Sequence, residues 1–182
     1  MNLRQELERY HSASYGWALA CCAHDRAQAD DVLQTVYVKV LEGRARYDGR
    51  SAFKTWLFAV IRKTAAGAWR HHLFHARHLT LQEEDVSFAV DESPEEVFER
   101  TQRLARLREA LAALPDRQRQ ALHLVFYEEM SVREAAAVMG VSLGTARVHY
   151  ERGKKRLRQR LEETEVSDGS RSPRRAIQDV VS

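Results

Sequence analysis

The 182-residue chain contains few of the residues that make tight turns, with only 8 glycines and 3 prolines. Folds built from many short strands need frequent turns, so this scarcity argues against a turn-rich β architecture. The chain also lacks a run of about 18 apolar residues, and the sequence therefore predicts no membrane-spanning helix. Residues 1–20 are interrupted by charged side chains, so we expect no signal peptide.

The 2 cysteines, Cys21 and Cys22, are adjacent and cannot close a useful loop. The chain is therefore not a disulfide scaffold, and we expect it in a reducing cytoplasm. We interpret both cysteines as packing thiols, with a redox switch as the alternative. The sequence contains neither a nucleophile–base constellation nor a glycine-rich phosphate loop, so we predict no catalytic residues, no cofactor and no enzymatic activity.

The charges are unevenly distributed, although the 29 basic and 26 acidic residues nearly balance at +3. Residues 1–79 carry 12 basic and 7 acidic groups (+5), and residues 103–163 carry 13 and 8 (+5). Between them, residues 80–102 carry 1 basic and 8 acidic groups (−7). A polyanion could therefore contact both basic blocks, while the acidic connector would be repelled from it.

The first block shows helical periodicity in three stretches. We expect helices over residues 2–22, in the stretch from Val32 to Leu41, and over residues 52–72, with a loop at residues 44–51 because of its Asp-Gly pair. Apolar residues recur at helical spacing in the second stretch: Val32, Leu33, Val36, Tyr37, Val40 and Leu41. In the third stretch, we interpret Trp56 as a core residue rather than a base-stacking one.

The second block begins after residues 80–92, which lack helical periodicity and form the predicted linker. Ser93 and Pro94 restart a helix, whose stripe of leucines runs from Leu104 to Leu114. Pro115 ends this helix and opens the next, which we expect to reach about Tyr127. The predicted domains are residues 1–79 and 103–163, joined by residues 80–102, with a disordered tail at residues 164–182.

The stretch SVREAAAVMGVSLGTARVHYERGKKRLRQRL, residues 131–161, predicts a helix-turn-helix. Ser131 and Glu134 form a capping box, Gly140 suits a left-handed turn residue, and Ser142 can cap the second helix. On that helix, the predicted inward face comprises Ala146, Tyr150, Gly153, Leu157 and Leu161. The basic residues fall mostly on other faces, which favours insertion into the major groove of DNA. A merely solvated basic face is the alternative.

Motifs in both blocks resemble those of the extracytoplasmic-function (ECF) group of bacterial RNA polymerase sigma factors. In the first block these are DDVLQ at residues 30–34 and FKTWL at residues 53–57, followed by a basic helix. The second block matches with LPDRQ at 114–118, S-x-x-E at 131–134, GVS at 140–142 and GT at 144–145. The resemblance covers residues 3–163 and implies an all-α fold of two small helical domains joined by a flexible acidic linker.

The resemblance also implies three binding surfaces and two kinds of protein partner. Core RNA polymerase would be bound at its clamp and flap regions, with residues 30–38 on the clamp, and an anti-sigma factor is the other expected partner. The predicted polymerase-binding residues are Asp30, Asp31, Gln34, Thr35 and Val38. The −10 promoter element would be captured as a single strand by Tyr47, Asp48, Arg50, Phe53, Lys54, Arg62, Lys63 and Arg70. The −35 element would be read as duplex by Ser142, Gly144, Thr145, Arg147, Val148, His149, Arg152 and Lys155.

The chain departs from the family pattern at three of these positions. Lys63 stands where the family often has asparagine, and lysine lacks the paired donor and acceptor that asparagine offers a base edge. Val148 and His149 stand where serine and arginine are frequent, so the −35 sequence preference is not carried over. The rival interpretations are a helix-turn-helix regulator with an N-terminal sensing or dimerisation domain, and a metal-sensing protein built on His71, His72, His75 and His78. We predict no metal site.

Overall fold

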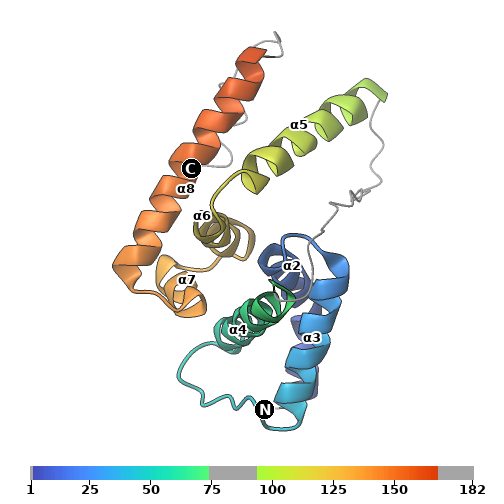
Figure 1. Cartoon of the computed structure of the whole chain (residues 1–182), viewed down its shortest axis with the longest axis vertical. Coiled ribbons are helices and arrows are strands. Elements are labelled where there is room, and N and C mark those ends of the chain that lie inside the picture. Colours follow the sequence, from blue (N-terminus) through green and yellow to red (C-terminus); the bar gives the residue numbers. More distant parts are fainter. Residues whose placement is uncertain (1, 74–93, 168–182) are drawn as a thin grey trace.

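The computed structural model describes the backbone of residues 2–73 and 94–167, and the side chains of residues 2–68 and 100–163. The regular secondary structure of these residues is entirely helical, which agrees with the predicted all-α class (Figure 1). The N-terminal half comprises α1 (Leu3–Arg9), α2 (His11–Cys21), α3 (Arg26–Leu41) and α4 (Phe53–Leu73). The C-terminal half comprises α5 (Pro94–Ala112), α6 (Asp116–Leu122), the π-helix η1 (His123–Tyr127), α7 (Val132–Met139) and α8 (Leu143–Ser167). None of the helices described is both long and apolar enough to cross a membrane.

The single helix expected over residues 2–22 is in fact two helices. The chain leaves helical geometry at Tyr10, whose φ is −99° and ψ is 11°, and α2 begins at the next residue. The Tyr10 ring stacks on Phe53 with a centroid separation of 6.1 Å. The break lets α1 lie against α3 while α2 packs on both α3 and α4. Periodicity alone missed it because the apolar residues continue in phase across the break.

The N-terminal half is organised around Trp17, which is fully buried. Its ring stacks on Phe58 at 5.9 Å, and its Nε1 donates a hydrogen bond to the Phe58 carbonyl oxygen at 3.0 Å. A buried indole N–H without a partner would be costly, so this bond fixes how α2 crosses α4. The predicted stripes of α3 and α4 are largely confirmed, since Val32, Val36, Val40, Leu57 and Ile61 are all at most 2% exposed.

In the C-terminal half, the helix expected to run to Tyr127 changes from α-helical to π-helical at His123. The Glu128 N–H donates to the His123 carbonyl oxygen at 3.1 Å, a bond that spans one more residue than in an α-helix. Around α6, the residues Ala110, Leu114, Leu122 and Leu157 form a small core. The predicted leucine stripe of α5 is only partly buried, because Leu104 is 41% exposed.

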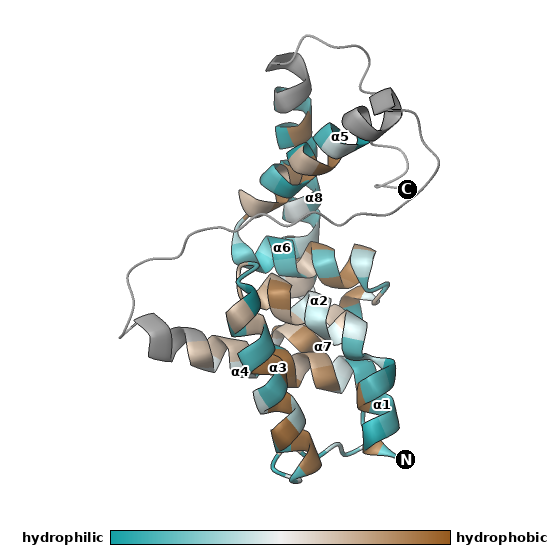
Figure 2. Cartoon of the chain, turned by 90° about the vertical axis from the view of Figure 1, so that its right-hand side faces the viewer, coloured by the Kyte–Doolittle hydropathy of each residue, from teal (hydrophilic) through white to brown (hydrophobic). Residues whose placement is uncertain are grey.

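The two halves share one apolar core, which the sequence did not predict. Helix α7 packs against α4, and Figure 1 shows the two side by side. Residues of both halves belong to a single buried cluster, to which the C-terminal half contributes Ala121, Leu124, Met130, Ala135, Val138 and Met139. Figure 2 shows hydrophobic residues on α2 and on α7.

Some predictions fall on residues that the structure does not describe. They concern the linker at residues 80–92, the cap at Ser93 and most of the tail at residues 164–182. One boundary can be compared, because α8 continues to Ser167 and so passes the predicted domain end at residue 163.

Candidate nucleic-acid interface

The turn between α7 and α8 is built as the sequence predicts. Ser131 Oγ accepts a hydrogen bond from the Glu134 N–H at 3.2 Å, and the Glu134 carboxylate accepts one from the Ser131 N–H at 2.9 Å. These two bonds form the expected capping box. Gly140 ends α7 with φ 63° and ψ 40°, a conformation that favours glycine. Ser142 Oγ then accepts from the Thr145 N–H at 3.1 Å and caps α8.

Helix α8 presents a small-residue face to the protein and a basic face to solvent. Ala146 and Leu157 are buried, and a side-chain carbon on Gly153 would lie 3.2 Å from the Gln118 carbonyl oxygen. The predicted inward face is therefore confirmed, with Tyr150 and Leu161 half-buried at its edges. Close packing of α8 on α6 at Gly153 fixes which residues point outward.

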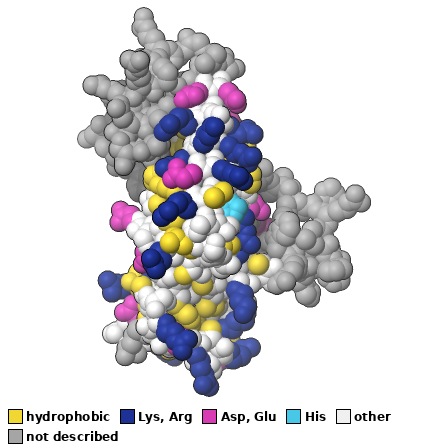
Figure 3. Space-filling model, turned by 90° about the vertical axis from the view of Figure 1, so that its left-hand side faces the viewer, with side chains coloured by type: hydrophobic (Ala, Val, Ile, Leu, Met, Phe, Trp, Pro, Cys, Tyr) yellow, Lys and Arg dark blue, Asp and Glu magenta, His cyan; other side chains and the backbone are white. Residues whose placement is uncertain are grey.

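All of the predicted −35 residues lie on the outer surface at or after the start of α8. Ser142, Gly144 and Thr145 surround the helix N-terminus, where the two hydroxyl oxygens lie 2.8 Å apart. Exposed side chains follow along the helix, with half-buried His149 among them: Arg147, Val148, Arg152 and Lys155. Figure 3 shows lysine and arginine side chains along α8 on this face of the molecule.

The predicted polymerase-binding residues share the solvent-exposed side of α3. Asp25 caps this helix by accepting a hydrogen bond from the Gln28 N–H at 3.0 Å. The exposed residues are Asp30, Asp31, Gln34, Thr35 and Val38. Val38 is 45% exposed and Leu41, one turn further on, is 50% exposed, so Leu41 does not join the core stripe in which it was expected. Leu41 is in helical phase with Gln34 and Val38, which is the signal that could have assigned it to the outer face.

The predicted −10 residues of the loop before α4 are organised by aromatic contacts. The Tyr47 ring lies 5.4 Å from Phe53 and 5.3 Å from Trp56, measured between centroids. Phe53 is 7% exposed and Trp56 is half-buried, so both support the loop from beneath, and the core interpretation of Trp56 agrees with its packing. The Tyr47 hydroxyl donates to the Ser51 carbonyl oxygen, which ties the loop into a compact turn.

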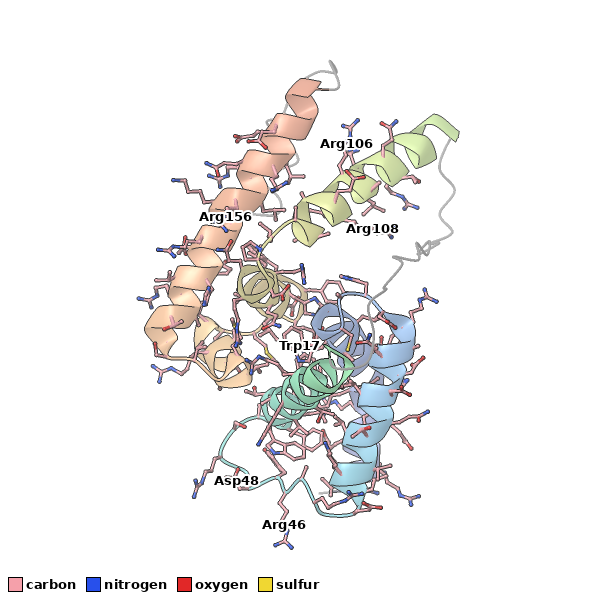
Figure 4. All side chains as sticks on the ribbon, in the orientation of Figure 1. Trp17, Arg46, Asp48, Arg106, Arg108 and Arg156 are labelled. Atoms are coloured by element: carbon pink, nitrogen blue, oxygen red, sulfur yellow. The ribbon has the colours of Figure 1, made fainter. Side chains whose placement is uncertain are left out.

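The tip of this loop carries charge. Asp48 accepts a hydrogen bond from the Arg50 N–H at 3.2 Å, and the Arg50 guanidinium lies 3.3 Å from the same carboxylate. Between them Gly49 adopts φ 75°, a left-handed conformation. In Figure 4, Asp48 and its neighbour Arg46 point away from the helices into solvent.

Two of the predicted −10 cations, Lys54 and Arg62, are covered by the C-terminal half. Lys54 Nζ lies 2.8 Å from Glu128 Oε2 and donates to the Glu128 carbonyl oxygen at 3.0 Å. Arg62 Nη1 lies 3.6 Å from where a Cβ of Gly140 would be, at the turn of the helix-turn-helix. Burial and the nearby Arg117 lower the pKa of Arg62 from its ordinary value. By contrast Lys63 is exposed, and the side chain of Arg70 lies outside the described residues.

Glu128 and His123 are the residues that sequence reasoning missed. The Glu128 side chain is 3% exposed, and its Oε1 lies 3.4 Å from His123 Nε2. The His123 ring in turn packs against Trp17 at 5.3 Å. Burial alone would raise the pKa of Glu128, but the neighbouring His123 and Lys54 groups outweigh burial and hold it below its ordinary value. No local motif signals this cluster, because Trp17 and Lys54 are far from His123 and Glu128 in the chain.

The cysteines and histidines bear on the alternative interpretations. Burial raises the pKa of Cys21, and it raises the pKa of Cys22 to about 11. Thiols of this kind are poor nucleophiles at neutral pH, which favours packing over a redox role. The histidines at positions 71, 72, 75 and 78 lie outside the described side chains. Within the part of the chain that is described, no three His, Cys, Asp or Glu side chains are grouped to hold a metal ion.

Comparisons with known proteins match both halves of the chain. Residues 7–73 match the family model for sigma-70 region 2, and residues 104–157 match that for sigma-70 region 4. The RNA polymerase sigma factor CarQ of Myxococcus xanthus is 31% identical over 164 residues, which is 89% of this chain and 91% of CarQ. The ECF RNA polymerase sigma factor RpoE of Cereibacter sphaeroides is 30% identical over 74% of this chain and 73% of its own length.

Solved structures show the same fold. The sigma factor RpoE from Bartonella quintana, in complex with the anti-sigma factor NepR, superposes with a TM-score of 0.69 at 22% identity. The alignment covers 88% of this chain and 97% of that one. CnrH, in complex with the cytosolic domain of CnrY, superposes with a TM-score of 0.60 at 22% identity, over 87% of this chain and 86% of CnrH.

These likenesses extend over both halves and define a sigma factor, the promoter-specificity subunit of RNA polymerase. The chain belongs to the ECF group of RNA polymerase sigma factors. It functions as an alternative sigma factor rather than as a conventional helix-turn-helix regulator.

Proposed function

We propose that the protein binds core RNA polymerase through the outer face of α3 and captures the −10 strand with the α4 region, while α8 reads the −35 duplex. The observation that carries this assignment is the basic outer face of α8, held in place by the capped turn and the Gly153 contact. Phosphate contacts from such a face would make binding depend strongly on salt.

The outer face of α3 is suited to a protein partner. It combines carboxylates and amides with two exposed apolar residues, Val38 and Leu41, on a rigid capped helix. Exposed apolar groups rimmed by polar ones are typical of protein interfaces. We assign Asp30, Asp31, Gln34, Thr35 and Val38 to the polymerase clamp, with Leu41 added from its exposure.

The α4 region is suited to an unpaired strand. Tyr47 is half-buried on an aromatic base, so one edge of the cluster can meet a flipped nucleotide. The charged groups at Asp48 and Arg50 in the loop and at Lys63 on α4 are exposed. Lys54, Arg62 and Arg70 complete the predicted set, with cationic groups for phosphates.

On α8, the side chains nearest the helix N-terminus would face base edges and the later cations would face phosphates. Val148 offers an apolar contact of the kind that suits a thymine methyl, and Arg147 can pair with guanine. Arg152 and Lys155 lie further along and suit the DNA backbone. Region 4 would also contact the polymerase flap.

The partners and location follow from the same assignment. The protein would act in the cytoplasm without catalytic activity of its own, lending sequence-specific affinity to the polymerase. An anti-sigma factor is the expected inhibitor, and the superposed sigma factor RpoE from Bartonella quintana was solved with the anti-sigma factor NepR bound.

The decisive experiment is reconstituted transcription from genomic promoter fragments. Core polymerase plus this protein should start transcripts at defined sites, whereas either component alone should not. Mapped start sites would also give the −35 and −10 sequences. Tight binding of the free protein to a duplex, with no transcripts when core polymerase is added, would contradict the proposal.

A further inference from the structure

The two DNA-binding surfaces lie side by side in this structure, and they cannot both bind one promoter in that position. The −35 and −10 elements are ~25 base pairs apart, or about 85 Å of duplex at ~3.4 Å per base pair. Yet Gly140, which adjoins the start of α8, lies 3.6 Å from the Arg62 guanidinium of the −10 set, measured from its ideal Cβ. The structure is therefore a closed form, and promoter binding requires the halves to separate.

The contact that closes the molecule also occupies a predicted DNA-binding group. Lys54 Nζ meets both the carboxylate and the backbone carbonyl of Glu128, so its positive charge is already neutralised. The Lys54 side chain is 24% exposed and that of Glu128 is 3% exposed. A DNA phosphate and the Glu128 carboxylate would compete for the same ammonium group. Among the described residues nothing covers the basic face of α8 in this way, because Arg147, Arg152 and Lys155 are exposed in the closed form.

Local backbone geometry presents Glu128 to Lys54. Glu128 follows the π-helical turn η1, and Glu129 then adopts φ 54°, a left-handed conformation that is strained for a residue with a side chain. Both π-helical turns and such strained residues are concentrated at functional and switching sites. The carboxylate also lies 3.4 Å from Nε2 of His123, whose ring packs on Trp17 of the N-terminal half.

We propose that Glu128 is an internal latch that holds the helix-turn-helix half on α4 and keeps Lys54 from the −10 strand until polymerase binding separates the halves. The inference rests on the proposed −10 role of Lys54. The closed form can present α8 to duplex DNA but cannot offer the complete −10 surface. Free protein should therefore bind single-stranded DNA less tightly than its charge predicts, because only the fraction of molecules in the open form can bind the strand.

The test compares three variants of the full chain by small-angle X-ray scattering and by binding to a fluorescein-labelled, mixed-sequence single-stranded DNA. Glu128→Gln removes the latch charge with little change in shape. It should increase the radius of gyration and tighten strand binding about fivefold, since more molecules are open. Glu129→Gln removes the same charge from the exposed neighbouring residue and should resemble the wild type in both measurements.

Lys54→Met breaks the same pair from the other side. It should also increase the radius of gyration, but it should not tighten strand binding, because the cation that binds phosphate is gone. Circular dichroism checks that the helices persist, and Lys54→Met keeps the scattering test decisive if Glu128→Gln does not fold.

Radii of gyration for Glu128→Gln and Lys54→Met that equal the value for Glu129→Gln would overturn the latch. Expansion of Glu128→Gln without tighter strand binding would overturn the claim that Glu128 guards Lys54. Failure of the wild type to support transcription with core polymerase would instead overturn the proposed function, and the scattering result would be unaffected.

Discussion

Arg147 and Arg152 on α8 are exposed, whereas Lys54 and Arg62 on α4 lie against the other half of the chain. The two predicted DNA-binding surfaces therefore differ in their availability rather than in their charge. The residues of the predicted −35 surface all lie at or on the capped helix α8, and the packing of Gly153 on α6 is enough to orient them. The proposed −10 surface would be complete only when the halves are apart, so it would depend on the conformation of the whole molecule.

The largest expected effect comes from disturbing the packing that displays the −35 surface. Gly153→Val should destabilise the protein by about 3 kcal/mol, because the new side chain would press on the Gln118 carbonyl and on Leu122. Chemical denaturation measures this change. Gly67, inside α4, has open space around it, so Gly67→Ala should instead stabilise by about 0.5–1 kcal/mol. Equal effects at the two glycines would show that the α6–α8 contact is not tight.

The next effect concerns the partner that would open the −10 surface. Reversing the charges with Asp30→Lys and Asp31→Lys should weaken binding to core polymerase by about 2 kcal/mol, as for truncated or reversed charges in an interface. Biolayer interferometry with immobilised core polymerase measures it. Glu6→Lys with Glu8→Lys, on α1, makes the same change in net charge away from this face and is the matched control. Unchanged affinity in the α3 variant would show that core polymerase does not bind this face of α3.

A smaller effect is expected from single cations of the open −35 surface. Arg147→Ala should weaken binding of duplex −35 DNA by about 1–3 kcal/mol and relax base preference, and Arg152→Ala should weaken it without changing preference. Fluorescence anisotropy against duplex and single-stranded probes separates the two surfaces. Single-strand capture should hardly change in either variant. If it fell as much as duplex binding, α8 would not be a separate reading surface.

The smallest effect is the pH dependence of the closed form. The folded pKa of Glu128 lies below its ordinary value of 4.5, so its stabilising contribution is present above that value and is lost as the pH falls through the folded pKa. The radius of gyration of the wild type should therefore rise in acid, below about pH 4.5. The Glu128→Gln variant should lack this acid-induced rise in the radius of gyration. A rise of the same size in that variant would show that other carboxylates cause it.

Much of the helix-turn-helix that would carry the −35 surface could be predicted from sequence because its determinants are local. Ser131, Glu134, Gly140 and Ser142 act within one helical turn of their partners, and the inward spacing from Ala146 to Leu157 follows from helical geometry. The exposed face of α3 was predictable for the same reason, apart from Leu41. Local rules failed at Tyr10, where the packing of its ring on Phe53 accompanies a helix break, and at His123, where the helix widens.

The closed state was beyond sequence reasoning because its contacts are not local. Lys54 and Glu128 are 74 residues apart in the chain, and each alone looks like an ordinary surface charge. A motif match assigned Lys54 to the −10 strand without any information about what covers it. Only the folded chain shows that the same side chain is paired.

The sequence by itself determined the all-α class, the helix-turn-helix and its outer face, and the family, because capping, periodicity and short motifs are properties of neighbouring residues. Only the tertiary structure decided that the two halves share a core and that Glu128 meets Lys54. Such pairing depends on how helices from distant parts of the chain pack. Burial then strengthens the electrostatic interaction of a single carboxylate relative to the same interaction in water.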